Sequence, residues 1–350
     1  MDQRHAYFLL MHFMKTSFQI HIARILLYAT ALLLMATHTP AAIASVGDQL
    51  GVVGVSQQGS VQIGRIAFVD VNQSKLIEMD MTGKVTWEYS IPFTMSFGGK
   101  LSSGTDVEWL PSSDNFLLAI PEAGVFEVNR KGEVVWQYKT RYIDHDADRL
   151  PNGNTVFVNG WDADVDPIVT EVDPSGKIVM QLFAEQLGLD AKERNSSQGE
   201  RYSNTHINAI QQLAEGEYLI SLRNYNQFLR FKDGKVVVRY MNARNVHDPV
   251  PYKGGYLFAI HYRDSSQLIL QKETRQREPL FKPEPGTWTP LRTVELLKNG
   301  NILVTGSREV GQLDEAGNLV WSVVIESYVN QKSDQRKKSG FFYKVAFVYK

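Results

Sequence analysis

Four histidines lie downstream of residue 44, and three of them occur in similar short segments. An imidazole serves as a nucleophile, as a general acid or base, or as a metal ligand. Arg223 ends an apolar stretch, and a guanidinium beside several imidazoles is suited to hold a tetrahedral oxyanion. The three histidine segments are Asp144-His145-Asp146-Ala147-Asp148, Thr205-His206-Ile207-Asn208-Ala209 and Val246-His247-Asp248-Pro249.

These residue types are compatible with three kinds of site. In the first, the histidines have a structural role and hydrogen-bond neighbouring elements. In the second, three imidazoles bind a metal ion. In the third, the imidazoles act as nucleophile and as acid or base on an anionic substrate. Adjacent residues of a strand face opposite ways, so Asp146 and Asp248 are not expected to complete a metal site. A separate Asp162-Ala163-Asp164-Val165-Asp166 segment opens like a calcium loop, but Pro167 replaces the turn glycine and no glutamate closes the loop.

A repeated pattern supplies the elements that must position these residues. One half of the unit is an Asp or Asn, a Gly turn and a hydrophobic strand, often with Trp, which is a β-hairpin signal. The other half is a second turn between two strands. The first half occurs at residues 80–87, 129–136, 173–180, 232–238 and 314–321, and the second at 110–118, 150–158, 213–220, 252–258 and 297–304. Joined, the halves make about four strands, which is one propeller blade.

The chain is therefore predicted to be all-β, with a lead-in over residues 45–64 and a six-bladed β-propeller of four-stranded blades over residues 65–350. A strand over residues 341–349 would complete the first blade and close the ring, which removes an exposed edge. Residues 183–204 make one interval longer than the others. The predicted blades are an incomplete one over residues 65–89 and five that begin near Thr105, Asp144, Thr205, Val246 and Leu291.

Three of the histidines occupy the same position within successive repeats, and this predicts that they lie close together in space. Because the first strand of each propeller blade lines the central channel, His145, His206 and His247 are expected around one mouth of it. The matching position holds Arg292 in the sixth blade and Asp106 in the second.

Charge and composition exclude several classes of function. Lys and Arg number 37 against 38 for Asp and Glu, a net charge of -1, so no cationic excess exists to neutralise a nucleic-acid backbone. The absence of cysteine excludes disulfides, thiolate metal sites and a cysteine nucleophile.

Residues 1–44 have the pattern of a secretory signal peptide, with Met14 as the expected start. A basic region from Lys15 to Arg24 precedes an apolar run over residues 25–36 and the A-x-A site Ala42-Ile43-Ala44. The run is too short to favour a membrane-spanning helix. We expect cleavage after Ala44, a periplasmic or secreted mature protein, and no stable membrane span in it.

The ordered segments around His145, His206, Arg223 and His247 resemble those of the bacterial arylsulfate sulfotransferases. The resemblance rests on His145-Asp146-Ala147-Asp148, on the His-x-Asn of His206-Ile207-Asn208, on Ser221-Leu222-Arg223-Asn224 and on Val246-His247-Asp248-Pro249, and it covers nearly all of residues 65–350. The large members of that family carry an additional N-terminal β-sandwich domain and a cysteine pair, both absent here, so this chain resembles a short form.

The resemblance implies a periplasmic propeller enzyme without a cofactor. Such an enzyme moves a sulfuryl group from an aryl sulfate to a phenol through a transiently sulfated histidine. His247 matches the nucleophile, while His145, His206 and Arg223 match groups that bind sulfate and assist proton transfer. The other class left open is a non-catalytic periplasmic propeller that serves as a binding or assembly scaffold, because quinoprotein-like repeats with Gly and Trp also occur in such proteins.

Overall fold

The computed structural model describes residues 50–159, 165–189, 205–327 and 342–349, which all belong to the unit Leu50–Lys350. The predicted signal peptide, residues 162–164 of the calcium-loop segment and residues 190–204 of the insertion lie outside the described residues. No helix among the described residues is long and apolar enough to cross a membrane.

The Asp–Gly turns of the repeat build one hairpin of most blades. In the first of them the Gly83 amide donates to the Asp80 carbonyl, and the Asp80 carboxylate accepts hydrogen bonds from two amides of the turn. The turn needs a left-handed residue, which glycine adopts without a Cβ clash. Four equivalent glycines have φ between +80° and +87°: Gly83, Gly132, Gly176 and Gly317.

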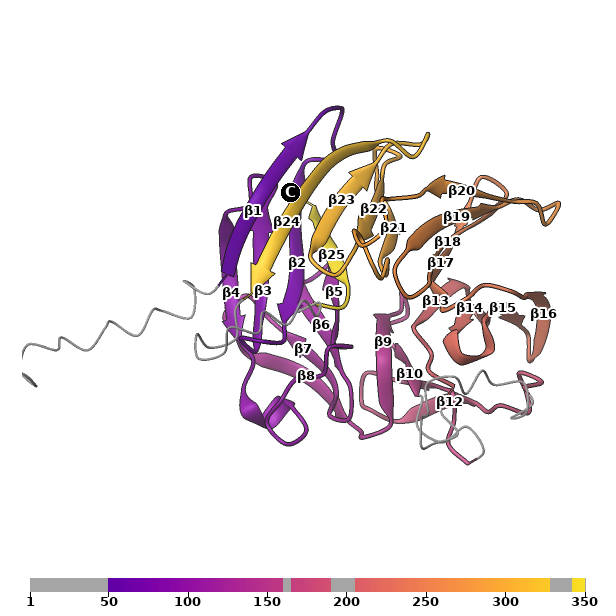
Figure 1. Ribbon diagram of the computed structural model, residues 1–350. Coiled ribbons are helices and arrows are strands. Elements are labelled where there is room, and N and C mark those ends of the chain that lie inside the picture. Colours follow the sequence, from indigo (N-terminus) through magenta and orange to yellow (C-terminus); the bar gives the residue numbers. More distant parts are fainter. Residues whose placement is uncertain (1–49, 160–164, 190–204, 328–341, 350) are drawn as a thin grey trace, which may run out of the picture. The chain divides into compact units, whose positions relative to one another are not determined.

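The described strands form six antiparallel sheets arranged as propeller blades around a common centre (Figure 1). From the centre outward, the first three blades are β25 (Val345–Tyr349), β2 (Gly64–Asp70), β3 (Lys75–Asp80) and β4 (Val85–Ser90); β5 (Asp106–Leu110), β6 (Asn115–Ile120), β7 (Gly124–Val128) and β8 (Val134–Lys139); and β9 (Ile143–Arg149), β10 (Thr155–Asn159), β11 (Val169–Val172) and β12 (Ile178–Leu182).

The other three blades follow the same order. They are β13 (Ala209–Ala214), β14 (Glu217–Leu222), β15 (Gln227–Lys232) and β16 (Lys235–Tyr240); β17 (His247–Tyr252), β18 (Gly255–His261), β19 (Ser266–Gln271) and β20 (Arg277–Phe281); and β21 (Val294–Leu296), β22 (Ile302–Thr305), β23 (Glu309–Leu313) and β24 (Leu319–Ser327). Two short 3-10 turns, η2 (Phe93–Met95) and η4 (Arg223–Tyr225), lie in connections.

The ring closes as the sequence predicts, because the C-terminal strand β25 pairs with β2 and becomes the innermost strand of the first blade. The lead-in adds a feature that the repeat does not indicate. Its strand β1 (Leu50–Gln57) pairs with β24 as a fifth, outer strand of the sixth blade.

The core lies between the blades rather than within them. Each of six clusters of buried hydrophobic side chains draws its members from two neighbouring blades. Outer-strand tryptophans add a directional contact, because each donates its indole N–H to a carbonyl in the turn of the next blade. The three bonds are Trp87 to Arg130 at 3.1 Å, Trp136 to Pro174 at 2.9 Å and Trp321 to Met81 at 3.0 Å.

This packing fixes one innermost strand of each blade against the axis. All six run in the same direction, so the residues at which they begin lie at one end of the ring, which we call the histidine face. The residues at which they end lie at the opposite face.

Candidate functional site

Three of the predicted residues form one hydrogen-bonded row at the histidine face. His145 in β9 lies with its Nε2 3.1 Å from Nε2 of His206, which stands three residues before β13. Nη1 of Arg223, the first residue after β14, lies 3.1 Å from Nδ1 of His206. The backbone holds the two residues together, because the His206 carbonyl accepts a hydrogen bond from the Arg223 amide. His206 itself adopts a left-handed conformation, with φ +47°.

The contacts among Gly104, His145, His206 and Arg223 give one set of neutral tautomers, in which the unprotonated Nε2 of His145 also faces Asp144 Oδ1 at 3.1 Å. Nδ1 of His145 lies 3.2 Å from the Gly104 carbonyl, which only accepts, so this nitrogen carries the proton. Nε2 of His145 is then the acceptor and Nε2 of His206 the donor, which leaves Nδ1 of His206 to accept from the guanidinium. Burial lowers the pKa of His145 to about 3, so the neutral form is favoured at neutral pH.

A carboxylate lies beside the same row. Asp144 Oδ1 is 3.1 Å from Nε2 of His145, and the other oxygen of that carboxylate accepts the Ile207 amide. A proton taken up on Nε2 of His145 would therefore lie next to a negative charge. This makes the row a place where a proton can be received and returned.

His247 begins β17 and is only 3% exposed. Its Nδ1 lies 2.8 Å from the Asn245 carbonyl and must donate to it, so the lone pair of the neutral ring is on Nε2. Burial lowers the pKa of His247 well below its usual value, and the positive charge of Arg292 acts in the same direction. His247 is therefore a neutral imidazole whose Nε2 carries a lone pair at neutral pH.

His261, the fourth histidine, ends β18 with its ring centroid 5.3 Å from that of His247. Burial lowers its pKa to about 4, and Arg223 and Arg292 contribute to the shift. Asn245 joins the two histidines, because its carbonyl accepts from His247 and its side-chain amide donates to the His261 carbonyl.

Tyr343, which the sequence argument missed, connects His247 to the row. Its ring centroid lies 4.9 Å from that of His145 and 5.9 Å from that of His247. Its hydroxyl donates to Asn208 Oδ1 at 2.9 Å, and burial raises its pKa well above its usual value. His206 of the His-x-Asn pair thus belongs to the row, and Asn208 accepts the hydrogen bond that orients the Tyr343 hydroxyl.

Arg292 lies at the mouth, as its position in the repeat predicts. Its guanidinium is 5.0 Å from the centre of the Tyr343 ring and donates to the Phe342 carbonyl. Arg292 and Arg223 both lower the pKa values of His145, His247 and His261, so two cationic side chains act on all three rings.

The second blade differs from the expectation. Gly104, rather than Asp106, faces His145, and Asp106 lies one layer deeper on the axis. There it joins Asp146 and Asp248 around Lys344, whose Nζ lies 2.7 Å from Asp146, 3.0 Å from Asp248 and 3.8 Å from Asp106.

We call these four side chains the axial hub. Burial alone would lower the pKa of Lys344, but the three carboxylates raise it well above its usual value. Asp146 and Asp248 face away from the imidazoles that precede them in the chain, as strand alternation requires, and bind this cation instead.

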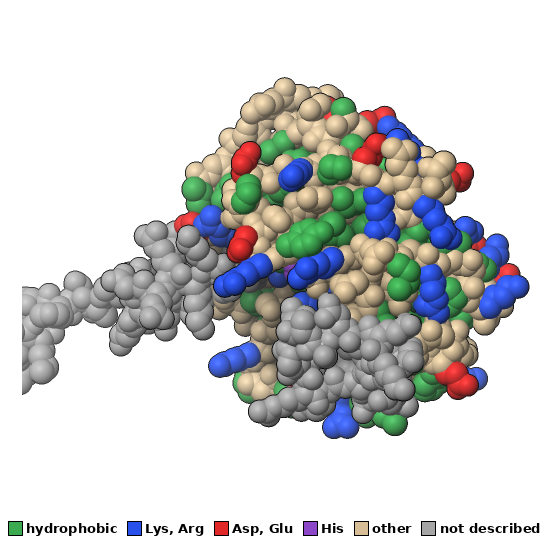
Figure 2. All heavy atoms as spheres, turned by 45° about the vertical axis from the view of Figure 1, so that its right-hand side comes forward, with side chains coloured by type: hydrophobic (Ala, Val, Ile, Leu, Met, Phe, Trp, Pro, Cys, Tyr) green, Lys and Arg blue, Asp and Glu red, His purple; other side chains and the backbone are tan. Residues whose placement is uncertain are grey.

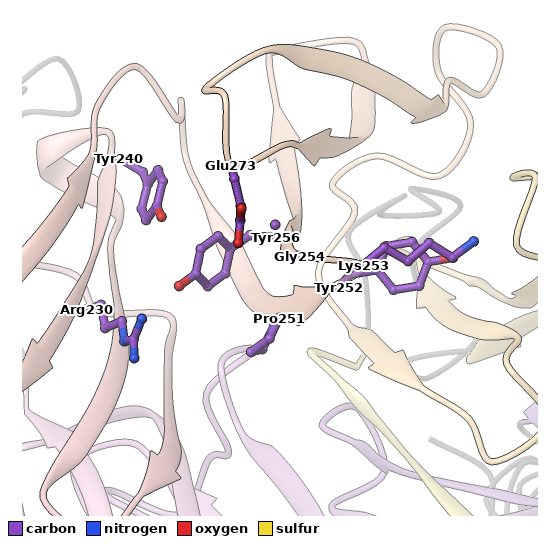
Figure 3. A pocket seen from close by; sticks show the side chains of 9 residues that line it. Arg230, Tyr240, Pro251, Tyr252, Lys253, Gly254, Tyr256 and Glu273 are labelled. Carbon is purple, nitrogen blue, oxygen red and sulfur yellow. The ribbon is translucent and has the colours of Figure 1, made fainter.

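No group of three or more His, Asp or Glu side chains among the described residues has the geometry of a metal site. Two cavities occur at the opposite face and involve none of the predicted site residues. One of about 540 Å³ is lined by residues that include Glu108, Asp148 and Gln211. The other, of about 370 Å³, lies between the fourth and fifth blades, where Tyr240, Tyr256 and Glu273 point toward a common space (Figure 3).

Replacing Gly104 by alanine tests whether the His145 tautomer depends on its neighbour. A Cβ at this position would lie 2.0 Å from Nδ1 of His145, so the ring must move and lose its bond to the carbonyl. We expect the ¹⁵N resonances of His145 to change from a pure Nδ1–H pattern. Gly54→Ala is the matched control, because a Cβ there meets nothing within 4 Å. Unchanged His145 resonances in Gly104→Ala would contradict the assigned tautomer.

Comparison with known proteins identifies the fold and not the chemistry. No family model and no curated protein sequence matches the chain. Among solved structures it is similar to a protein of unknown function from Bacteroides caccae, with TM-score 0.56, 14% identity and coverage of 83% of this chain and 100% of that one.

It is also similar to two lyases. A streptogramin B lyase gives TM-score 0.50 at 14% identity over 81% of this chain and 88% of that one. A catalytically inactive virginiamycin B lyase from Staphylococcus aureus with quinupristin gives TM-score 0.50 at 13% identity over 81% and 90%. At these identities the likeness extends to the fold alone.

Proposed function

We propose that this propeller is an exported arylsulfotransferase-like enzyme that moves a sulfuryl group from an aryl sulfate to a phenol through a sulfated His247. The observation that carries the proposal is the state of His247. It is buried, its Nδ1 donates to a carbonyl and its Nε2 keeps a lone pair, and burial lowers its pKa so that the neutral form is favoured at neutral pH. A neutral nucleophile in a cationic environment suits attack on an anionic ester.

In the first half-reaction, the lone pair on Nε2 of His247 attacks sulfur. The N–S bond forms, the S–O bond to the aryl group breaks, and the electron pair leaves with the phenolate oxygen. The phenolate leaves as an anion and takes its proton from solvent, because the neutral His145–His206 row has no acidic proton to give. The equatorial oxygens of sulfur bear the charge that Arg223 and Arg292 stabilise.

The second half-reaction is the reverse with a different phenol. The row takes the phenolic proton, the phenol oxygen attacks sulfur, and the N–S bond breaks to return neutral His247. The row then returns that proton to solvent, so the second half-reaction needs no separate base. Tyr343 stays protonated, since burial raises its pKa, and its ring separates His145 from His247.

The pH dependence follows from the direction of the His247 shift. A lowered pKa keeps the imidazole neutral as pH falls through 6.5, and the nucleophile is lost only on protonation at lower pH. We expect phenol release under single-turnover conditions to be nearly constant from pH 7.5 to about pH 5.5. A stopped-flow profile that instead loses half its rate near pH 6.5 would show that His247 titrates like a solvated imidazole.

A non-catalytic binding or assembly scaffold is the second candidate, and one contact favours it. The tip nitrogens of His145 and His206 bond to one another, as expected of imidazoles that only hold neighbouring blades together. One assay distinguishes the transferase from the scaffold. Purified protein with 4-nitrophenyl sulfate and excess phenol releases 4-nitrophenol if the transferase proposal is right, and no release across a panel of aryl sulfates favours the scaffold.

A further inference from the structure

The exposed aromatic side chains of the described residues gather at one end of the molecule. They all lie in connections at the histidine face, whereas the exposed aliphatic side chains are mostly on outer strands. The most exposed are Phe93 at 73% and Phe97 at 64%. We call this set the aromatic rim: Phe93, Phe97, Tyr142, Phe183 and Tyr262.

Cationic side chains lie beside two members of the aromatic rim. Arg141 lies 5.1 Å from the ring centre of Tyr142, and Arg244 lies 5.1 Å from that of Tyr262. The described connections 91–105, 140–142, 183–189, 241–246 and 262–265 contain four cationic side chains, those of Lys100, Arg141, Arg244 and Arg263, against the two carboxylates of Glu185 and Asp264. In Figure 2 a histidine is visible between hydrophobic and basic side chains on this face.

Two members of the rim, Tyr142 and Tyr262, lie close to the candidate site along the chain. Tyr262 directly follows His261, whose ring contacts His247, and Arg244 precedes His247 by three residues. Tyr142 likewise precedes His145 by three residues. A molecule whose sulfate reaches the imidazoles would therefore present the rest of its body to exposed rings and guanidinium groups.

We propose that the aromatic rim selects aryl sulfates with an extended, multi-ring body over single-ring ones. This inference rests on the proposed function for the position of the sulfate. The distal rings stack on rim side chains, and the guanidinium groups favour a ligand that is both aromatic and anionic. A single phenyl sulfate would occupy the imidazole cluster without using these contacts.

Binding of aryl sulfonates tests the inference apart from turnover, because their C–S bond does not transfer. The probes are benzenesulfonate, naphthalene-2-sulfonate and pyrene-1-sulfonate, measured by calorimetry on the full chain. We expect affinity to increase at least about tenfold from one ring to four, as one or two added stacking contacts would give. Tyr262→Ala and Tyr142→Ala should each weaken pyrene-1-sulfonate about three- to tenfold and leave benzenesulfonate unchanged.

Val179→Ala is the matched control, because Val179 is 50% exposed on the outer strand β12 and should have no effect. Equal affinity for all three sulfonates, or an equal loss for benzenesulfonate in the rim variants, would overturn the inference. It would also be overturned if the rim variants lost binding only to phosphatidylglycerol vesicles, since the rim would then be a membrane-contacting surface.

The two proposals fail separately. If affinity increases with the number of rings but no aryl sulfate is turned over, the inference about the aromatic rim stands and the transferase proposal is rejected. If 4-nitrophenyl sulfate is turned over but affinity does not increase with the number of rings, the transferase proposal stands and the inference about the rim is rejected.

Discussion

His247→Asn is expected to release no measurable phenol from an aryl sulfate that the wild-type protein consumes. The substitution keeps a side-chain N–H that can donate to the Asn245 carbonyl, so local structure is preserved while the nucleophilic nitrogen is removed. Because both half-reactions pass through the N–S bond, we expect a loss of at least about 10³-fold in each, as for other covalent nucleophiles.

His261→Asn is the matched control for that experiment. It removes a buried imidazole whose ring lies 5.3 Å from that of His247 but which has no covalent role in the proposal. We expect a loss of less than about tenfold, through the position of His247 alone. Equal losses in the two variants would reject His247 as the nucleophile and indicate that the cluster acts only as a structural unit.

Lys344→Met is expected to destabilise the fold by about 3–5 kcal/mol at pH 7, because it leaves buried carboxylates without their cation. Urea unfolding measures the change. The loss should become smaller at pH 5, since burial raises the pKa of Asp106 well above its usual value and that of Asp248 to about 6. Both carboxyls then take up protons, and the uncompensated charge is relieved.

The control is Lys253→Met, which breaks an ion pair of similar length at the surface. Lys253 lies 2.8 Å from Glu315, and both side chains are more than half exposed. An exposed pair contributes less than about 1 kcal/mol, so this variant should unfold almost like the wild type. If Lys344→Met were no more damaging than Lys253→Met, the axial hub would not hold the innermost strands together.

The fold was predictable because the turn that begins each outer hairpin requires a left-handed residue. Gly83 and its equivalents recur for that reason, and the tryptophans recur because each binds the next turn. The role of β1 was not predictable in the same way. Its pairing with β24 follows from the exposed edge of the sixth blade and not from a repeated motif.

The site was predictable where it depends on repeat phase. The common position of His145 and His206 in successive blades places their rings in contact. Gly104 was missed because it acts through its backbone carbonyl, which any residue possesses. Tyr343 and Lys344 were missed because they reach the axis only when the C-terminal strand closes the ring, and no local pattern near residue 343 indicates the histidines that it meets.

Trapping the sulfated intermediate tests the central claim most directly. The protein is mixed with an aryl sulfate in the absence of an acceptor, quenched in mild alkali and digested, and the peptides are analysed by mass spectrometry with electron-based fragmentation. The account predicts that one SO₃ group is added on His247, that it disappears when phenol is supplied, and that it is absent from His247→Asn. Phenol release from wild type with no modified histidine, or with the SO₃ group on another residue, would contradict it.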